Sequence, residues 1–421
     1  ALVMTTAGTT TGPFDTSSTT DATTRPVATT TTSAPSSETD TTDPGLSSSA
    51  GDTSTTLDTT TAANAACPSD TAADPAAWSL SHGVPGEALT LHSRAAPPGA
   101  IVYTTMSAGV LDLGGGPIDT NSAAHIFIAS RTPAGAFAWA EHLGGPANTM
   151  NISGFDAATD CAGNLLIGGT FSGDISTQGV TLSASPGLEF DDGMAFPTVD
   201  LFLVKFSPDG QLQWAHRFGD GQSQRFRGLD VQGDGTVVLT ADVLGTLDLG
   251  GPPTVAPGFF PVGVLAAFAG DGTLAWQRAF SGSHGVWPSD LDVGADDRIS
   301  LLASVPGSVD LGGGVLIDAQ YPRVLAQFAA DGSHRWSQRF KHPAHFPSLV
   351  AADAVGGTIV TGYTAPGDGS FPGFVLRHDS LGVFAWERLF VPDANTPEKV
   401  NMTTVAAGAE IVVGGRFTGA I

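Results

Sequence analysis

The stretch that decides the fold is Leu201–Gly219, LFLVKFSPDGQLQWAHRFG. It reads as two short strands joined by a tight Asp209-Gly210 turn, with Trp214 on the second strand. An Asp-Gly dipeptide between two such segments predicts a β-hairpin. Similar Trp hairpins are expected at 126–144, 201–219, 264–280, 324–340 and 374–390. Five copies of one hairpin indicate a repeat protein.

A second pair of predicted strands separates each Trp hairpin from the next. In 227–245, a short strand that ends near Asp230 leads through a turn into an apolar, β-branched strand. Such pairs are expected at 88–109, 152–173, 227–245, 289–307, 349–367 and 403–419. No segment has the periodicity of an amphipathic helix, so the sequence predicts an all-β fold. Four-stranded units that repeat along a chain are typical of a single β-propeller.

The number of units predicts how the propeller closes. Six strand pairs but only five complete Trp hairpins follow one another along the chain. Ala76–Gly83, AAWSLSHG, supplies a sixth Trp strand that has no strand pair of its own. We therefore expect six four-stranded blades, the last one closed by this N-terminal latch strand. Seven blades are the alternative.

The chain divides into two regions of different composition. Residues 1–66 are rich in Thr and Ser and contain one basic residue, Arg25. Such a composition offers too little apolar surface to offset the entropy cost of folding. We expect a low-complexity stalk or linker over 1–66, O-glycosylated if the protein is exported, and a β-propeller over 67–421. An unmodified linker is the alternative for the first region.

The charge of the chain limits its partners. Its 41 acidic and 17 basic residues give a formal net charge of -24. Nucleic-acid phosphates and anionic lipid surfaces repel such a chain, so we expect no nucleic-acid partner. No apolar run reaches the roughly 18 residues of a membrane helix, so we also expect no membrane span.

One segment has a specific family resemblance. Ala352–Pro372, ADAVGGTIVTGYTAPGDGSFP, resembles the bacterial beta-propeller repeat family SBBP, with its Thr-Gly-Tyr-Thr core and following Phe-Pro. Asn164–Gly169 and Ile411–Gly415 are looser versions, and the Asp-Gly-x-x-x-Trp hairpins resemble quinoprotein-like propeller repeats. The resemblance covers roughly 75–421. It implies a propeller scaffold, but members of such families share no single chemistry.

Four Asp residues are the candidate site. Asp156, Asp230, Asp292 and Asp353 recur near the ends of the short strands, which in a propeller lie close to the central channel. Their carboxylates could ring one channel mouth and hold a cation. We prefer the interpretation that each Asp caps its own turn by accepting backbone N–H bonds. We therefore assign no catalytic residue, no metal and no cofactor.

The remaining candidates have structural explanations. No D-x-D-x-D-G calcium loop occurs, so six further Asp residues are predicted to form turns: Asp209, Asp271, Asp331, Asp112, Asp248 and Asp310. His342 and His345 have H-x-x-H spacing, but Pro343 argues against a helix and predicts an exposed loop. The repeat Trp residues are expected to wedge between blades. Trp287 lies outside the repeat pattern and is a candidate ligand platform.

The two cysteines indicate the compartment. Cys67 and Cys161 are the only cysteines, and an even pair behind a stalk-like segment suits an oxidising environment. We predict a disulfide between them and an extracellular or cell-surface location.

Two function classes remain open. The first is a non-enzymatic surface protein whose rigid propeller binds a surface polysaccharide or protein, or assembles with copies of itself. The alternative is a propeller enzyme, a hydrolase or a quinone-dependent oxidoreductase, with its site at the channel mouth. Four Arg residues that could hold a quinone fall on predicted outer strands, which weighs against it: Arg217, Arg278, Arg339 and Arg388.

Overall fold

The computed structural model describes eleven stretches of the chain: 2–6, 90–96, 100–132, 134–145, 152–187, 198–318, 322–341, 345–365, 371–391, 400–407 and 411–417. Every regular element within these stretches is a β-strand, which confirms the predicted all-β fold for them. Among the same residues, no helix qualifies as a membrane span.

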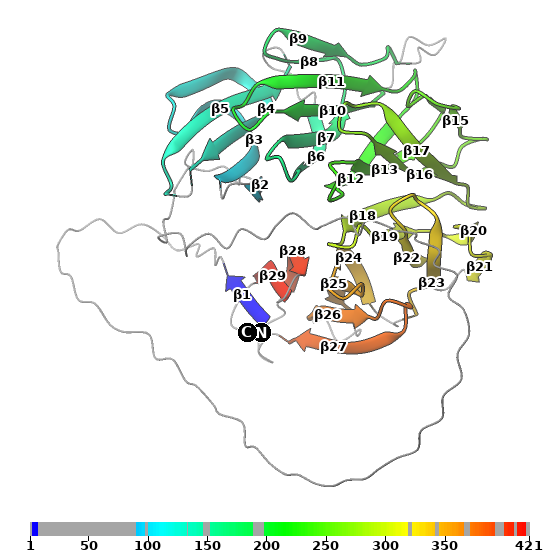
Figure 1. Cartoon of the computed structure of the whole chain (residues 1–421). Helices are drawn as coiled ribbons and strands as arrows, with labels where there is room; N and C mark the ends of the chain where they lie inside the picture. The colour runs from blue at the N-terminus through cyan, green and yellow to red at the C-terminus, as the bar shows by residue number, and fades with distance from the viewer. Residues whose placement is uncertain are drawn as a thin grey trace, which may run out of the picture. The chain divides into compact units, whose positions relative to one another are not determined.

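The predicted strand pairs and Trp hairpins combine into antiparallel sheets whose strands follow chain order (Figure 1). The first sheet contains β2 (Thr90–Ala96), β3 (Ala100–Asp112), β4 (Pro117–Arg131) and β5 (Phe137–Gly144), extended by β8 (Asp174–Thr177) and β9 (Val180–Ser183). The second contains β6 (Ile152–Thr159), β7 (Leu165–Phe171), β10 (Asp200–Phe206) and β11 (Leu212–Phe218).

The next three sheets repeat this four-stranded order. The third contains β12 (Gln224–Val231), β13 (Val237–Val243), β16 (Val262–Phe268) and β17 (Leu274–Phe280). The fourth contains β18 (Trp287–Val293), β19 (Ile299–Ser304), β22 (Arg323–Phe328) and β23 (His334–Arg339). The fifth contains β24 (His345–Ala352), β25 (Thr358–Thr364), β26 (Gly373–His378) and β27 (Phe384–Phe390).

Buried apolar side chains fill the space between successive sheets. On β13, Val237 and Leu239 pack with the second sheet, whereas Val238 packs with the fourth. Successive side chains of a strand point to opposite faces, so a sheet covered on both faces needs apolar residues at every position. This explains why four central strands are buried along their whole length: β7, β10, β13 and β16.

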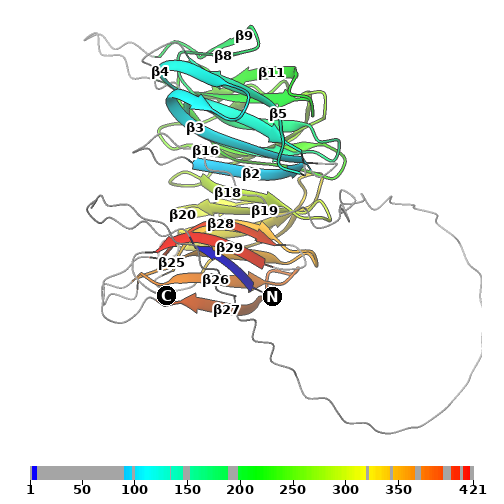
Figure 2. The same cartoon turned by 90° about the vertical axis from the view of Figure 1, so that its left-hand side faces the viewer.

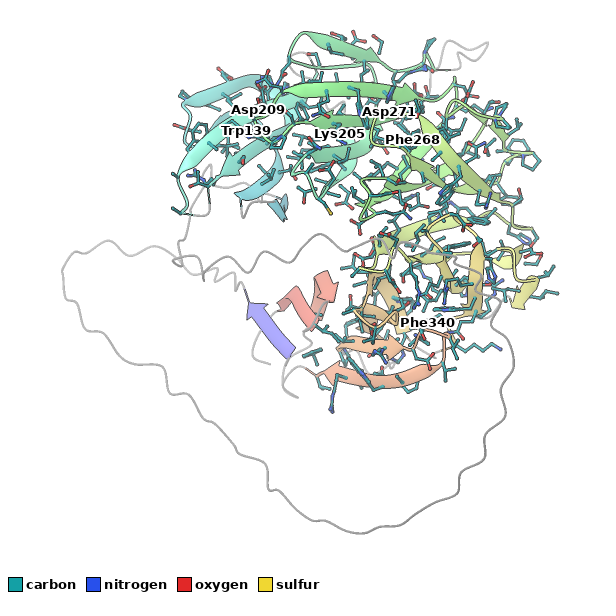
Figure 3. The ribbon with its side chains drawn as sticks, viewed as in Figure 1. Trp139, Lys205, Asp209, Phe268, Asp271 and Phe340 are labelled. Atoms are coloured by element: carbon teal, nitrogen blue, oxygen red, sulfur yellow. The ribbon has the colours of Figure 1, made fainter. Side chains whose placement is uncertain are left out.

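A Trp on the outer strand of one sheet contacts the outer turn of the next. Trp139 donates from Nε1 to the carbonyl of Pro208 at 2.7 Å, beside Asp209 of the second sheet (Figure 3). The glycine beneath each ring has a positive φ, and a Cβ atom there would collide with or crowd the indole. The pairs are Trp139–Gly210, Trp214–Gly272, Trp276–Gly332 and Trp336–Gly382. These four Trp residues are wedges between sheets, as expected.

Short hairpins branch from the second strands, and their Asp-Leu-Gly-Gly turns form as predicted. β14 (Thr246–Leu247) pairs with β15 (Thr254–Val255), and β20 (Gly307–Asp310) pairs with β21 (Val315–Asp318). Asp310 accepts bonds from the N–H groups of Gly312 and Gly314, at 2.7 and 3.1 Å.

The last sheet contains β28 (Val400–Ala407) and β29 (Ile411–Phe417), with β1 (Leu2–Thr6) as its third strand (Figure 2). β1 runs parallel to β29. The sequence predicted an unstructured stalk here, but Leu2-Val3-Met4 is an apolar run that favours a strand. The expected latch, Ala76–Gly83, lies outside the described residues.

Candidate functional site

The inner strands β6, β12, β18 and β24 each form one edge of their sheet. Asp230 of β12 accepts the N–H of Val231 on its own strand and the N–H of Val293 on β18, both at 2.8 Å. A buried N–H without a partner costs free energy comparable to a lost hydrogen bond. One carboxylate therefore satisfies two edge donors and ties the third sheet to the fourth.

The same kind of bridge recurs between other neighbouring sheets. Asp156 of β6 accepts the N–H of Ala157 at 2.8 Å and that of Leu229 on β12 at 3.4 Å. Asp292 of β18 accepts the N–H of Ala352 on β24 at 2.7 Å. Carboxylates thus link the second sheet to the third and the fourth to the fifth.

Asp290 makes a further bridge that sequence reasoning missed. It accepts the N–H of Val350 on β24 at 2.8 Å. Burial raises the pKa of Asp290 to about 8; the bond from Val350 opposes the rise, and the charges of Asp156 and Asp230 add to it. At neutral pH this carboxyl is therefore mostly protonated. The signal in the sequence was its i,i+2 spacing from Asp292, which places both side chains on one face of a strand.

The sequence predicted that the four Asp residues recur near the ends of the short strands, but they do not occupy one equivalent position there. Asp230 and Asp292 are each one residue before the end of their strand, whereas Asp156 lies three residues before the end of β6. Asp353 follows the end of β24 and belongs to the turn. The turns that follow β6, β12, β18 and β24 are equally long, so the offset lies within the strands themselves.

Asp353 caps its own turn, as the preferred interpretation stated. Its Oδ1 accepts the N–H groups of Val355 and Gly357 at 3.0 and 2.7 Å. Its Oδ2 accepts from Nε of Arg377 at 2.6 Å. For the other three predicted residues, the described bonds run along the strand and to the next sheet instead.

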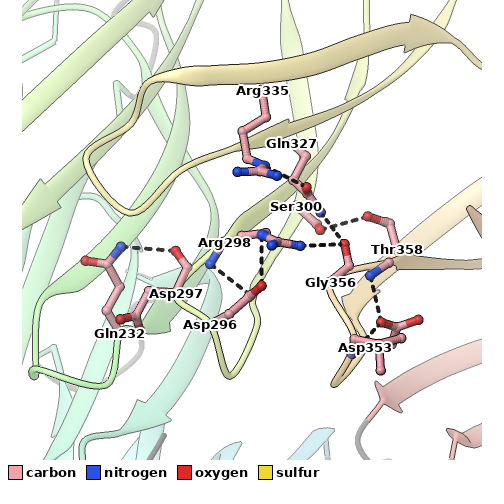
Figure 4. Close-up of polar contacts among 12 residues, drawn as sticks. Gln232, Asp296, Asp297, Arg298, Ser300, Gln327, Arg335, Asp353, Gly356 and Thr358 are labelled. Carbon is pink, nitrogen blue, oxygen red and sulfur yellow. Dashed lines mark hydrogen bonds and ion pairs between the residues drawn. The ribbon is translucent and has the colours of Figure 1, made fainter. Parts of the chain in front are cut away.

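Polar contacts also join the inner turns of successive sheets (Figure 4). Nε2 of Gln327 and Nη1 of Arg298, both in the fourth sheet, donate to the carbonyl of Gly356 at 3.0 and 3.4 Å. The hydroxyls of Ser300 and Thr358 lie 3.0 Å apart. The turns of the fourth and fifth sheets are thereby fixed to each other.

The described geometry offers no preformed cation cage. In the ranges that the structure covers, no group of three or more His, Cys, Asp or Glu side chains could hold a metal ion. Asp156, Asp230 and Asp290 lie near enough for their charges to interact, but their oxygens accept backbone N–H bonds. What these carboxylates do here is bind the sheets together.

The histidine and cysteine candidates lie apart from these carboxylates. The predicted exposed loop is wrong for His345, which begins strand β24 and is partly buried, with its Nε2 2.5 Å from Oε1 of Glu387. His342 is outside the described residues. Cys161 lies in the turn after β6, and the described part of the chain contains no free cysteine. Cys67 is also outside that part, so its bond to Cys161 stays a prediction.

A surface cavity of about 170 Å³ lies between 257–262 and 281–283, in the loops before β16 and β18. Phe259 and Phe260 are among its lining residues and are 99% and 48% exposed; together they are called its aromatic lip. The rings of Phe260 and His284 have centroids 5.7 Å apart. Trp287 is half-buried and packs against Gly285, but it does not line the cavity. Sequence reasoning singled out none of the residues that line it.

No protein-family model and no curated protein sequence matches the chain. Solved structures are similar at low identity. A protein of unknown function from Bacteroides caccae is 13% identical, with a TM-score of 0.30, over 62% of this chain and 89% of its own. The Hadza microbial sialidase Hz136 is 11% identical, with a TM-score of 0.39, over 75% of this chain and 60% of its own.

An acylaminoacyl peptidase from Pyrococcus horikoshii is 12% identical, with a TM-score of 0.38, over 75% of this chain. The match covers 47% of the peptidase. The chain therefore spans less than two thirds of the length of the sialidase and of the peptidase. Likenesses with TM-scores of this size carry no argument about activity.

Proposed function

We propose that residues 67–421 form a six-bladed β-propeller that acts outside the cell, at the cell surface, as a non-enzymatic binding or structural protein. The observation that supports this most is the bridging of successive sheets by carboxylates. Asp156, Asp230 and Asp292 hold backbone N–H groups of the next sheet, so the repeated acidic residues have a structural task. A rigid scaffold of this kind presents its loops for binding.

The six-bladed count treats the sheet of β1, β28 and β29 as a blade. Ala76–Gly83 would then be its fourth strand. In this arrangement Trp78 would lie over the outer turn of the first sheet at Gly135, whose φ of 81° is positive like the φ values of the other turn glycines. Seven blades would require a further complete unit between the last sheet and the first.

We also propose that the repeats are of the SBBP type, because the structure gives a physical reason why glycine stands at the motif positions. A Cβ atom at Gly362, in the Thr-Gly-Tyr-Thr motif of β25, would lie 2.2 Å from the carbonyl oxygen of Phe346. At Gly169, in the looser copy, it would lie 2.8 Å from the carbonyl oxygen of Gly154. The two carbonyls lie on the inner strands β24 and β6, each beside a β-bulge or irregularity. A side chain at either motif glycine would collide with the strand there.

Partners are proposed from charge and composition. A chain of net charge -24 suits a neutral surface polysaccharide, a protein or a second copy of itself better than nucleic acid. Export would let Cys67 and Cys161 form a disulfide and the Thr-rich stalk carry O-linked sugars.

A propeller enzyme is the second candidate, and one observation favours it. The carboxyl of Asp290, with a pKa of about 8, lies within electrostatic reach of Asp156 and Asp230. A buried carboxyl whose pKa lies near neutral pH is suited to general acid and base catalysis. Against this, all three accept bonds from N–H groups of the next sheet, which a reacting group would have to give up.

Two measurements on the full chain separate these candidates. Protease treatment of intact cells should remove the protein, and a protein that survives until the cells are lysed would contradict a surface location. Purified Asp290→Asn and the matched surface variant Asp271→Asn should match the wild type on ester, glycoside and peptide substrates and in quinone-dependent dye reduction, with no turnover above buffer. Turnover that Asp290→Asn abolishes and Asp271→Asn keeps would establish the enzyme.

A further inference from the structure

We propose that the cavity between 257–262 and 281–283 binds one sugar unit of a neutral polysaccharide. The inference rests on the proposed surface function and deepens it, because it names the site and the class of ligand.

The lip of the cavity is aromatic and exposed. Phe259 is 99% exposed and Phe260 is 48% exposed, while the adjacent Gly258 has open space around it. A fully exposed Phe places a large apolar ring in water, and such rings on a soluble protein mark binding surfaces. The C–H face of a pyranose ring is apolar and flat, so it can stack on these rings while its hydroxyls remain free.

The segment 281–284, of which 281–283 lines the cavity, adds polar groups at fixed positions. Ser281, Ser283 and His284 are exposed. Oγ of Ser283 accepts the N–H of Ser308 at 3.0 Å and lies 3.0 Å from Nδ1 of His284. Hydroxyl and imidazole groups both donate and accept hydrogen bonds, as sugar hydroxyls do. An aromatic lip beside such groups matches the two kinds of surface on a sugar.

The walls are held by backbone bonds. Val286 donates its N–H to the carbonyl of Pro261 at 3.0 Å, and Ser283 donates to the carbonyl of Ser308 at 2.9 Å. A Cβ atom at Gly285 would lie 2.6 Å from the indole of Trp287, so this ring packs closely against the 282–285 loop. A preformed wall reduces the ordering cost of binding.

Charge and size limit the ligand. None of the residues that line the cavity is charged, and the whole chain carries -24. An anionic glycan would be repelled without a local cation to hold it, and a cationic ligand would find no carboxylate in the lining. The volume, about 170 Å³, is below the roughly 300 Å³ of sites for drug-sized molecules. One neutral ring fits better than an extended Pro-rich peptide, which needs a longer groove.

The test uses the full chain in native gels cast with soluble neutral polysaccharides: a glucan, a mannan and a galactan. The variant is Phe259→Ala with Phe260→Ala. The matched control is Phe384→Ala, since Phe384 lies on β27 and is 47% exposed, against 48% for Phe260. At least one polysaccharide should retard the wild type and the control equally. The double variant should bind at least about 10-fold more weakly, with an unchanged melting temperature.

Two outcomes overturn the inference. If no polysaccharide retards the wild type, the ligand class is wrong. If the double variant is retarded like the control, the site is wrong, although the proposed surface binding stands. In the first case light scattering then tests the proposed function separately: self-association that the double variant abolishes would make the aromatic lip a contact between copies.

Discussion

Asp230 on β12 accepts a hydrogen bond from the backbone N–H of Val293 on β18, 2.8 Å away and 63 residues further along the chain. A carboxylate of one sheet therefore accepts a hydrogen bond from the edge strand of the next sheet. The same relation between Asp156 and Leu229, and between Asp292 and Ala352, makes the bridge a repeated feature of the fold.

The wedge between sheets can be tested at its glycine. Gly332 and Gly179 have similar φ values, 73° and 79°, but a Cβ atom at Gly332 would lie 2.6 Å from the ring of Trp276, whereas Gly179 has nothing within 4 Å. Gly179→Ala should cost the backbone strain alone, about 1–2 kcal/mol of unfolding free energy. Gly332→Ala should cost about 2 kcal/mol more, because the indole must move. Urea unfolding measures both, and equal losses would contradict the wedge.

The pH dependence of stability can be tested at Asp290. Its folded pKa of about 8 is above the value of 3.8 in the unfolded chain, so between about pH 4 and pH 8 the folded state binds a proton that the unfolded state has lost. Asp290 therefore makes stability fall as pH rises through this window. Asp156 and Asp230 face it from β6 and β12, and their charges strengthen the effect.

The variant Asp290→Asn keeps a side-chain oxygen that can accept the N–H of Val350, but its amide does not titrate. The unfolding free energy of this variant should vary less than that of the wild type between pH 4 and pH 8, and at pH 8 it should be the higher of the two. Asp271→Asn, at an exposed turn, serves as the control and should keep the wild-type slope. Parallel curves for Asp290→Asn and wild type would show that Asp290 titrates normally.

The sheets could be predicted from the sequence, but the bridges could not. The wholly apolar strands β10 and β13, and the Asp-Gly turns between strands, carry their signal in side chains and in local spacing. The donor that Asp230 accepts from is the backbone N–H of Val293. Nearly every residue has such an N–H, so nothing in the sequence identifies Val293 as the partner. The parallel pairing of β1 with β29 joins segments about 400 residues apart and has no local signal either.

If 76–83 closes the last sheet, two N-terminal deletions should have different effects on stability. Removing 67–83 should expose a strand edge of the last sheet and lower the melting temperature or cause aggregation. Removing 9–60 leaves β1 and the repeats in place and should do neither. Circular dichroism melts and light scattering measure the effect, and equal behaviour of the two deletions would show that 76–83 is not the closing strand.

The disulfide predicts a change in thiol count. Denatured native protein should contain no reactive thiol before reduction and two after it, because Cys67 and Cys161 are the only cysteines. In the chain-entropy model, a loop of this length stabilises the fold by up to about 4–5 kcal/mol, so reduction should also lower the melting temperature. Two reactive thiols before reduction would exclude the bond.

The most direct test of the structural role of the carboxylates is the unfolding free energy of Asp230→Ala against Asp271→Ala. Asp230 holds two N–H groups on the edges of β12 and β18, whereas Asp271 accepts its bonds from Thr273 in an exposed turn. Hydrogen bonds to a charged group contribute about 1.5–3 kcal/mol each, and loss of the carboxylate leaves both edge donors without it. Urea unfolding should therefore show a loss of about 3–6 kcal/mol for Asp230→Ala and a clearly smaller one for Asp271→Ala. Equal losses, or an unchanged stability of Asp230→Ala, would contradict the account.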